Sequence, residues 1–341
     1  MANYTASVLV EAQLILNERF ASPEKRLKAT GVLGAFLKNT QLAIPNIGAL
    51  RTKEERPEKA YMLNRSKRST GTSRTHNHTG NAGDSSEIAI NWQTFSDVCS
   101  TSLKRADNNV YSDALILANE IENSLKNIYE SMDAAALAYL ASNKTGVNAA
   151  TKNGTWNPTN DVFELNEAKI ARLLQMGKNM LAQNHHKGLV DVILDPLLFV
   201  EAEHYLFQGA GNDTNLAYQS SGLSGLYQAI GLADADYDKG LGYFIPEGTI
   251  GVVDWIPKQN RQGYGDYESV LGGYGQITDP RTGMAIAVHG YSERANTAAA
   301  GGDTQDVVTQ WEFSVDTSFN NTPLSTADET TIFEVGVPTG A

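Results

Sequence analysis

Two stretches of the sequence place carboxylates or histidines close enough together to suggest a metal site. In the first, "EAEH", Glu201 and His204 are three residues apart and would share one face of a helix. Such a pair can supply one corner of a zinc site, but no third ligand lies nearby and no HExxH motif is present. A surface or capping role therefore explains this pair better than a metal site.

The second stretch, "DADYDKG", has Asp at positions one, three and five of a possible calcium loop. However, Lys239 stands where such a loop needs glycine, and Ile245 stands where it needs a bidentate glutamate. An acidic turn is the favoured interpretation. The sequence leaves open whether its three carboxylates bind a cation; they are Asp234, Asp236 and Asp238.

Motifs of nucleophilic or nucleotide chemistry are missing from the sequence. It has no G-x-S-x-G elbow and no Walker loop, and its G-x-G patterns near Gly240, Gly263 and Gly273 lack the strand-to-helix setting of a dinucleotide site. The single cysteine, Cys99, excludes an intramolecular disulfide framework and a Cys-rich zinc site. We therefore expect a protein that is not an enzyme and that uses no metal and no cofactor.

The remaining candidate is a charge pattern. The segment "RSKRSTGTSRTHNHTGNAG", residues 65–83, has four fixed positive charges, no acid and no large apolar side chain. Residues 1–80 contain 13 Lys and Arg against 6 Asp and Glu, a formal charge of +7, whereas residues 81–341 have a formal charge of −19. Such asymmetry indicates a partner of opposite charge, and the acidic body of another copy of this chain is one. We expect contacts between subunits from Arg65, Lys67, Arg68 and Arg74.

Two other interpretations of this basic segment stay open. Its cations could contact the phosphates of a nucleic acid, but no aromatic residue lies between Arg65 and Gly83 to stack on bases. It could also be a solvated loop without a partner.

The residues on either side of the basic segment indicate how it is held. "KAYMLN" and "EIAINW" have the character of short strands, so the segment is predicted to be the long loop of a protruding hairpin. Before the hairpin, residues 6–20 and 24–38 show helical spacing, which stops near Pro45.

After the hairpin, the sequence predicts one unusually long helix over about residues 108–142. Asp107 or Asn108 can cap its start, and Gly146 follows its end. Its apolar stripe, at alternating steps of four and three, consists of Ala114, Ala118, Ile121, Leu125, Ile128, Met132, Ala135 and Tyr139. A spine lying across a sheet is the favoured interpretation, because the stripe is short and rich in alanine for a coiled coil.

The rest of the chain mixes helices and strands. Residues 164–184 predict a second amphipathic helix and "GLVDVIL" a buried strand, after which Asp195 and Pro196 open a third helix. Residues 209–302 hold 18 of the 30 glycines, which indicates a loop-rich, mainly β region. "DVVTQWEFSVDTSF" and "TTIFEVGV" then predict closing strands. The fold class is therefore α+β.

Composition places the chain among globular proteins. Hydrophobic residues make up 41% of its 341 residues, and no apolar run reaches the roughly 18 residues that cross a bilayer. The N-terminus does not have the pattern of a signal peptide. We expect a soluble intracellular product that does not enter a membrane.

This order of elements resembles the major capsid proteins of tailed double-stranded DNA phages, which have the Hong Kong 97-type fold. "KAYMLNRSKRSTGTSRTHNHTGNAGDSSEIAINW" looks like the E-loop of that family, and Asn108 to Ser142 looks like its spine helix. The resemblance implies these parts: an N-terminal arm, 1–55; an extended E-loop, 56–100; a P domain, 101–208; an A domain, 209–302; and return strands of the P domain, 303–341.

The resemblance also implies a function. A major capsid protein assembles into hexamers and pentamers of an icosahedral head that encloses the genome. Its partners are then copies of itself, together with scaffold, portal and decoration proteins, and packaged DNA bound without sequence specificity. Its place is the virion, and its assembly occurs in the cytoplasm of the bacterial host.

The sequence departs from some relatives in two respects. Residues 1–50 are too short for a full scaffold-like helical domain, so a separate scaffold protein, or none, is implied. Lys67 and Asn64 lie in the loop that cross-links in some relatives, but nothing marks either residue as reactive. The alternatives are another virion protein, such as a tail tube or a double jelly-roll capsid, and then a cytosolic hydrolase; the long helix argues against the jelly roll.

Overall fold

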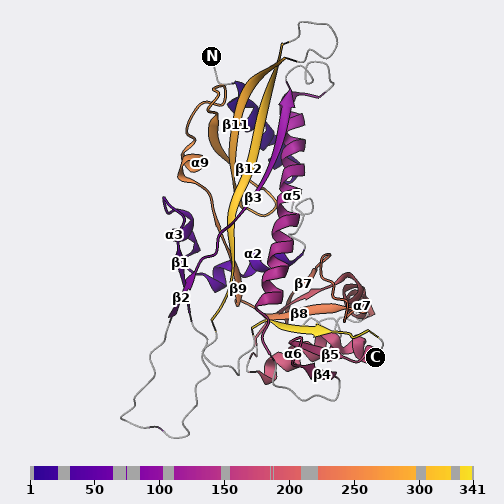
Figure 1. Ribbon diagram of the computed structural model, residues 1–341. Coiled ribbons are helices and arrows are strands. Elements are labelled where there is room, and N and C mark those ends of the chain that lie inside the picture. Colours follow the sequence, from indigo (N-terminus) through magenta and orange to yellow (C-terminus); the bar gives the residue numbers. More distant parts are fainter. Residues whose placement is uncertain are drawn as a thin grey trace.

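The computed structural model describes residues 4–21, 31–63, 74, 85–102, 111–146, 154–184, 186, 188–208, 222–296, 305–323 and 331–339. Figure 1 shows an elongated molecule in which one long helix runs beside long strands, with a second, smaller group of strands and helices at one end. The predicted α+β class is confirmed. Within the described ranges, no helix is long and apolar enough to span a membrane.

The long helix is α5, Asp113–Ser142. Its 30 residues give a rod of about 45 Å. It begins later than predicted: Ser112 is its N-cap, and the Ser112 hydroxyl accepts a hydrogen bond from the backbone N–H of Leu115. The predicted caps, Asp107 and Asn108, lie outside the described residues.

The apolar stripe of α5 is buried as predicted from Ala114 to Met132. In the last two turns the buried residues are Ala136 and Leu140, whereas the predicted Ala135 and Tyr139 are half-buried. The difference arises because steps of four and three average 3.5 residues, while a helix turns every 3.6, so the buried face drifts along a long helix.

A five-stranded sheet lies along α5. Its strands pair in the order β10-β11-β12-β3, and β9 also pairs with β12. All these pairings are antiparallel. The strands are β3 (Gln93–Ser102), β9 (Ile250–Trp255), β10 (Gly273–Thr278), β11 (Ala285–Asn296) and β12 (Gln305–Asn321). Strand β12, with 17 residues, is the central strand, because it pairs with β3, β9 and β11.

A six-stranded sheet forms the smaller end of the molecule, in the order β4-β5-β13-β8-β6-β7. Its strands are β4 (Gly154–Asn157), β5 (Val162–Leu165), β6 (Val190–Leu194), β7 (Leu223–Gln228), β8 (Leu241–Pro246) and β13 (Phe333–Gly336). Helices α6 (Leu173–Gln183) and α7 (Pro196–Gln208) pack against this sheet, and η1 (Glu167–Arg172) contacts both helices. The single helix predicted over residues 164–184 is thus divided into η1 and α6. Asp195 caps α7 as predicted, because its Oδ1 accepts from the Leu198 N–H at 2.8 Å.

In the predicted loop-rich region, residues 209–302, the structure describes residues 222–296, and the strands there are divided between the two sheets. Its strands β7 and β8 pair in the six-stranded sheet, and β9, β10 and β11 pair in the five-stranded sheet. Each of the two sheets therefore combines strands from this region with strands from other parts of the chain. Glycine content indicates turns, but it does not determine which distant strand each segment joins.

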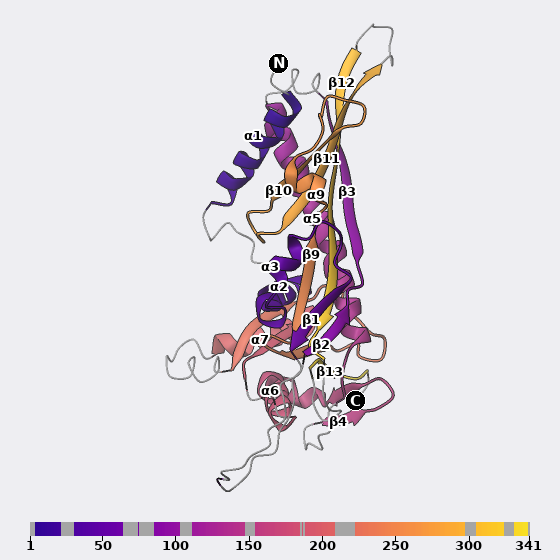
Figure 2. The same ribbon diagram turned by 90° about the vertical axis from the view of Figure 1, so that its left-hand side faces the viewer.

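The N-terminal helices pack against both sheets. They are α1 (Tyr4–Arg19), α2 (Val32–Ala43) and α3 (Ile47–Arg51). Helix α1 lies against α5, and α2 lies between α5 and β9 (Figure 2). The predicted helix at 24–38 is displaced, since α2 runs to Ala43, and residues 24–30 lie outside the described part.

Helix α2 begins with a cap that comes from another helix. Its N-cap residue is Gly31, which has φ +96° and no side chain to accept a hydrogen bond. Instead, Asp133 of α5 accepts from the Leu33 N–H at 2.8 Å. A Cβ on Gly31 would lie 2.6 Å from that carboxylate, so glycine is required for this contact.

The polar face of α2 binds both sheets. Toward the five-stranded sheet, the Val252 N–H donates to the Thr40 hydroxyl at 3.1 Å. Toward the six-stranded sheet, Lys38 and Asn39 donate to the two carboxylate oxygens of Asp191, at 2.8 and 2.7 Å. Asp191 lies in the fully buried strand β6 and is itself 0% exposed. Helix α2 is therefore the joint between the two sheets.

Replacing Asp191 should loosen this joint. Asp191→Ala removes the buried carboxylate from Lys38 and Asn39, which keep only Glu247 at 3.5 Å and the Ala35 carbonyl at 2.8 Å, respectively, among their charged or buried acceptors. We expect this loss to destabilise the subunit by about 3 kcal/mol. Urea unfolding of the unassembled chain measures this. Lys239→Ala is the control, because it removes a solvent-exposed pair with Glu167 and should cost less than about 1 kcal/mol. Equal losses in the two variants would contradict the assigned role of Asp191.

Candidate assembly surface

The predicted hairpin is present. Strands β1 (Lys59–Leu63) and β2 (Ser85–Ala89) pair antiparallel, from Lys59 opposite Ala89 to Leu63 opposite Ser85. The predicted contact residues Arg65, Lys67 and Arg68 lie outside the described residues, as does Asn64. Arg74 is described, and it is exposed to solvent.

The root of the hairpin is anchored by an apolar cluster. Met62 of β1 and Ile90, just after β2, are buried against residues of α3 and β9. The remaining buried members of this cluster are Ala43, Ile44, Ile47, Leu50, Ala60 and Val253. Two strands of five residues have little stability in isolation, so this contact fixes the hairpin to the body.

A second anchor is an ion pair at the same root. The Arg56 guanidinium donates to both carboxylate oxygens of Asp316, each at 2.9 Å. The Thr94 hydroxyl donates to the same carboxylate at 2.6 Å. Because Asp316 lies on β12, the chain that leads into the hairpin is bound directly to the central strand of the sheet. A bidentate pair of this kind restrains orientation as well as distance.

Next to this pair, Arg51 of α3 binds Asp254 of β9, with Nε and Nη2 at 2.8 and 2.5 Å from Oδ1. The carbonyl of Lys53 accepts from the indole N–H of Trp255 at 3.1 Å. The end of α3 and the start of the segment that follows it are thus bound to β9.

These contacts share one pattern. The carboxylates of Asp191, Asp254 and Asp316 are no more than 6% exposed, and each is bound by a cation from residues 38–56. Part of the charge asymmetry that the sequence analysis assigned to contacts between copies is therefore used within one chain. The available sequence signal was an isolated aspartate inside an apolar strand, as in "VDVIL" and "GVVDW". A buried aspartate of this kind requires a partner.

The acidic stretch at residues 234–238 forms a turn. The Asp236 N–H donates to Asp234 Oδ1 at 2.8 Å, and the Tyr237 N–H donates to the Asp234 carbonyl at 3.2 Å. The other candidate pair, Glu201 and His204, lies exposed on α7. Across the described ranges, no group of three or more His, Cys, Asp or Glu side chains is placed to hold a metal ion.

The lone thiol is not activated. Burial, together with the nearby carboxylates of Glu120 and Asp97, raises the pKa of Cys99 to about 12. At neutral pH the group is therefore a thiol rather than the nucleophilic thiolate.

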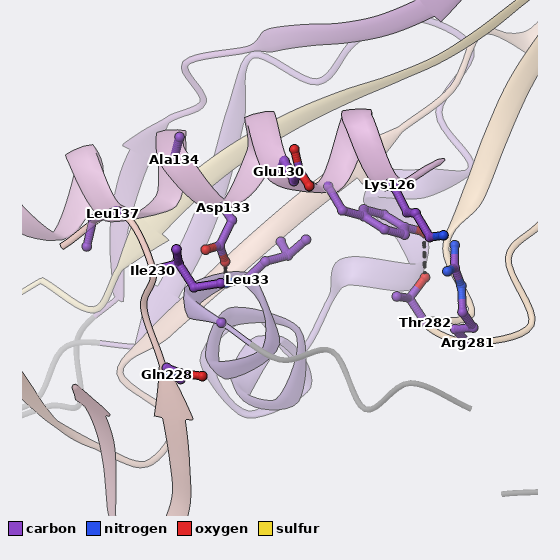
Figure 3. A pocket seen from close by; sticks show the side chains of 13 residues that line it. Leu33, Lys126, Glu130, Asp133, Ala134, Leu137, Gln228, Ile230, Arg281 and Thr282 are labelled. Carbon is purple, nitrogen blue, oxygen red and sulfur yellow. Dashed lines mark hydrogen bonds between the residues drawn. The ribbon is translucent and has the colours of Figure 1, made fainter. Parts of the chain in front are cut away.

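A cavity of about 600 Å³ opens between α5, the start of α2, the residues after β7 and the turn after β10 (Figure 3). Asp133 on its wall caps α2. Arg281 is bound to Asp279 at 3.1 Å and stacks against the rings of Phe20 and Tyr129. These two charged groups hold structural elements together, and they are not arranged around a common reacting atom.

No protein-family model matches the chain, and no curated protein matches its sequence. Solved structures align with it over most of its length. A structure from Mycobacterium phage Che8 is 9% identical, with 90% of each chain covered and a TM-score of 0.48. The capsid asymmetric unit of cyanophage A-1(L) is 10% identical, with 86% of this chain and 92% of that one covered and a TM-score of 0.48. The capsid of Ralstonia phage GP4 is 10% identical, with 83% and 84% covered and a TM-score of 0.42.

The ionic anchor of the hairpin can be tested without unfolding the body. Asp316→Asn should weaken the contact with Arg56 by about 1.5–3 kcal/mol, as expected for hydrogen bonds to a charged group. Hydrogen exchange of β1 and β2 should then become about tenfold faster or more, while exchange in α5 stays unchanged. Unaltered exchange in the hairpin would show that the apolar cluster is sufficient to hold it.

Asp133 should make the free energy of unfolding depend measurably on pH. Burial raises the pKa of its carboxyl above the usual value, although the Leu33 and Val32 N–H groups oppose the shift. A raised folded-state pKa means that the folded chain holds this proton more tightly. The resulting stability is present below the unfolded-state pKa of about 3.9 and is lost as pH rises through the folded value. The free energy of unfolding of the wild type should therefore fall relative to Asp133→Asn as pH rises across that window. Parallel curves in urea titrations would contradict this assignment.

Proposed function

We propose that this chain is the major capsid protein of a tailed double-stranded DNA phage, assembling into hexamers and pentamers of an icosahedral head. One observation carries the proposal: strands β1 and β2, which are anchored to the body, flank a basic segment, residues 65–83, whereas residues 81–341 have a formal charge of −19. The basic segment has no large apolar side chain that could pack against its own chain. It gains order when it lies on an acidic neighbour.

The order of elements supports this proposal. N-terminal helices, a hairpin, one helix of 30 residues and closing strands follow each other as the resemblance to Hong Kong 97-type capsid proteins implies. The division into two sheets also suits a shell protein, because an elongated subunit with one part at each end can contact different neighbours in a lattice (Figure 1).

Weak contacts are sufficient for such a function. An exposed ion pair contributes only about 0–1 kcal/mol, but in a closed lattice every subunit repeats each contact, so the energies accumulate. The loop residues Arg65, Lys67, Arg68 and Arg74 form these pairs, and their strength falls as ionic strength rises.

The further partners follow from a capsid role. Scaffold, portal and decoration proteins would bind the assembled lattice, and packaged DNA would meet its inner surface without sequence-specific contacts. The location is the virion, after assembly in the host cytoplasm. A tail-tube protein is the second candidate, and electron microscopy of the purified chain distinguishes the two, since it would show tubes rather than closed shells.

Neutralising the basic loop tests the proposal. Replacing Arg65, Lys67, Arg68 and Arg74 by Gln removes four contacts of about 0.5 kcal/mol each, which weakens each subunit contact by about 2 kcal/mol, or about 30-fold in Kd. Sedimentation and electron microscopy should then show free subunits at concentrations where the wild type assembles, with an unchanged circular dichroism spectrum of the subunit.

The matched control removes the same number of charges elsewhere. Lys126, Lys169, Arg172 and Lys239 lie on α5, on η1 and in the turn after residue 238. Their replacement by Gln should leave assembly close to that of the wild type. Normal shells from the loop variant would refute the role of the basic loop, and a rigid monomer for the wild type at all concentrations would refute the capsid function itself.

A further inference from the structure

An amine and a carboxylate lie in contact at the joint between the two sheets. Nζ of Lys38 on α2 lies 2.8 Å from Oδ1 of Asp191 on β6, and the two residues are 153 positions apart in the sequence. Every residue of β6 is buried, and Asp191 is 0% exposed. An amine and a carboxylic acid can condense to an amide with loss of one water molecule, and this reaction needs no oxidant, reductant or further reagent.

The packing holds the two groups in a geometry that favours this reaction. Both belong to packed elements, so the nitrogen stays beside the carboxyl carbon, and well-oriented reactions within one molecule reach effective molarities of about 10⁵–10⁸ M. Gly225 of β7 permits the close approach, because a Cβ at that position would lie 2.8 Å from Asp191 Oδ1. Burial favours the product as well, since one uncharged amide replaces two charges that are costly to remove from water.

The other carboxylate oxygen of Asp191 has a donor aimed at it. Asn39 Nδ2 donates to Asp191 Oδ2 at 2.7 Å. The direction of this amide is fixed, because Nδ2 also donates to the Ala35 carbonyl at 2.8 Å and Oδ1 accepts from the Gly248 N–H at 2.7 Å. When a nucleophile attacks the carboxyl carbon, negative charge develops on this oxygen. A donor that is already in place stabilises that charge, as an oxyanion hole does.

A second carboxylate can act as the base. Two of the three ammonium protons must leave Lys38 Nζ, and one of them can follow the hydrogen bond to Asp191. For the other, Glu247 lies 3.5 Å from Nζ. Lys38 also donates to the Ser224 hydroxyl, which donates to Glu247 Oε1 at 2.6 Å, so a proton path leads from the amine to this carboxylate. The nearby Tyr227 stays protonated, since burial and the adjacent carboxylates raise its pKa to about 12.

We propose that Lys38 and Asp191 form an intramolecular isopeptide bond in the folded subunit. The Lys38 ammonium first gives a proton to Asp191 Oδ1, which leaves a neutral amine beside a neutral carboxylic acid. The Nζ lone pair then attacks Cγ. Glu247 takes a second proton from nitrogen and passes it to the departing Oδ1 hydroxyl as the C–Oδ1 bond breaks. One N–H remains on the amide and one water molecule leaves, so atoms and charges balance.

The bond makes the joint between the two sheets covalent. It ties α2, which packs against α5 and β9, to β6 of the other sheet. A chain that unfolds with this bond intact keeps a closed loop, which lowers the entropy of its unfolded state. The ion pair described above is the state from which the bond forms. The inference goes beyond the proposed function, because the step takes place within one chain and requires no second copy.

Intact-mass spectrometry of the purified, unassembled chain tests the inference. The wild type should be lighter than the mass expected from its sequence by one water molecule. After proteolysis, tandem mass spectra should contain a branched peptide that joins the segment around Lys38 to the segment around Asp191. A folded wild-type chain at full mass would overturn the inference. Loss of water without the branched peptide would also overturn it, since a cyclic imide at an aspartate loses the same mass.

Replacing the nucleophile gives the informative variant. Lys38→Arg keeps a cation beside Asp191, but its guanidinium stays protonated and cannot form this amide. The variant should fold, as circular dichroism measures, and should retain its full mass. Lys144→Arg is the matched control: Lys144 binds the buried Glu334 of β13 at 2.6 Å, and this variant should still lose one water molecule. Loss of water from Lys38→Arg would overturn the inference.

Glu247→Gln tests the proton carrier. Glutamine has a similar volume but cannot take up the proton, so the bond should form about 100-fold more slowly or slower still. The rate is measured by the appearance of the branched peptide after cell-free synthesis of the chain. Glu201→Gln, at an exposed position of α7, should form the bond at the wild-type rate. An unchanged rate in Glu247→Gln would overturn the role assigned to Glu247.

Discussion

The fold depends on the carboxylate of Asp191, which must have hydrogen-bonding partners because it is buried. Asp191 is completely buried in β6, between β8 and β7 of the six-stranded sheet, where an unpaired charge would be very unfavourable. Lys38 and Asn39 supply its partners, and both lie on α2. Helix α2 is also capped by Asp133 of α5 and is hydrogen-bonded to β9 through Thr40. This one short helix therefore fixes the positions of α5 and the two sheets relative to one another.

The same chemistry recurs along the N-terminal part of the chain. Arg51 binds the buried Asp254, and Arg56 binds the buried Asp316. The body therefore contains buried anionic positions that hold basic residues in place. The contact proposed for the basic loop, between subunits, relies on the same complementarity of charge.

Local patterns predicted the elements better than their partners. The stripe from Ala114 to Met132 was sufficient to place α5, and "KAYMLN" with "EIAINW" was sufficient to predict a hairpin. The division of residues 209–302 between two sheets was not predicted, because strand pairing joins segments far apart in sequence and glycine content carries no information about register. The roles of Asp254 and Asp316 were missed for a similar reason. The arginine that binds each aspartate lies far away in the sequence, so the sequence does not show which acidic residues are paired.

The connection between the hairpin and β12 has a mechanical consequence. A pull on the hairpin reaches β12 through Arg56 and Asp316, near the place where β12 pairs with both β3 and β9. In antiparallel pairs the hydrogen bonds lie perpendicular to the strands, so tension along β12 stretches many of them sideways at once instead of opening them one after another. Strand β12 therefore distributes a force that is applied at the hairpin over all the hydrogen bonds that it makes with its neighbouring strands.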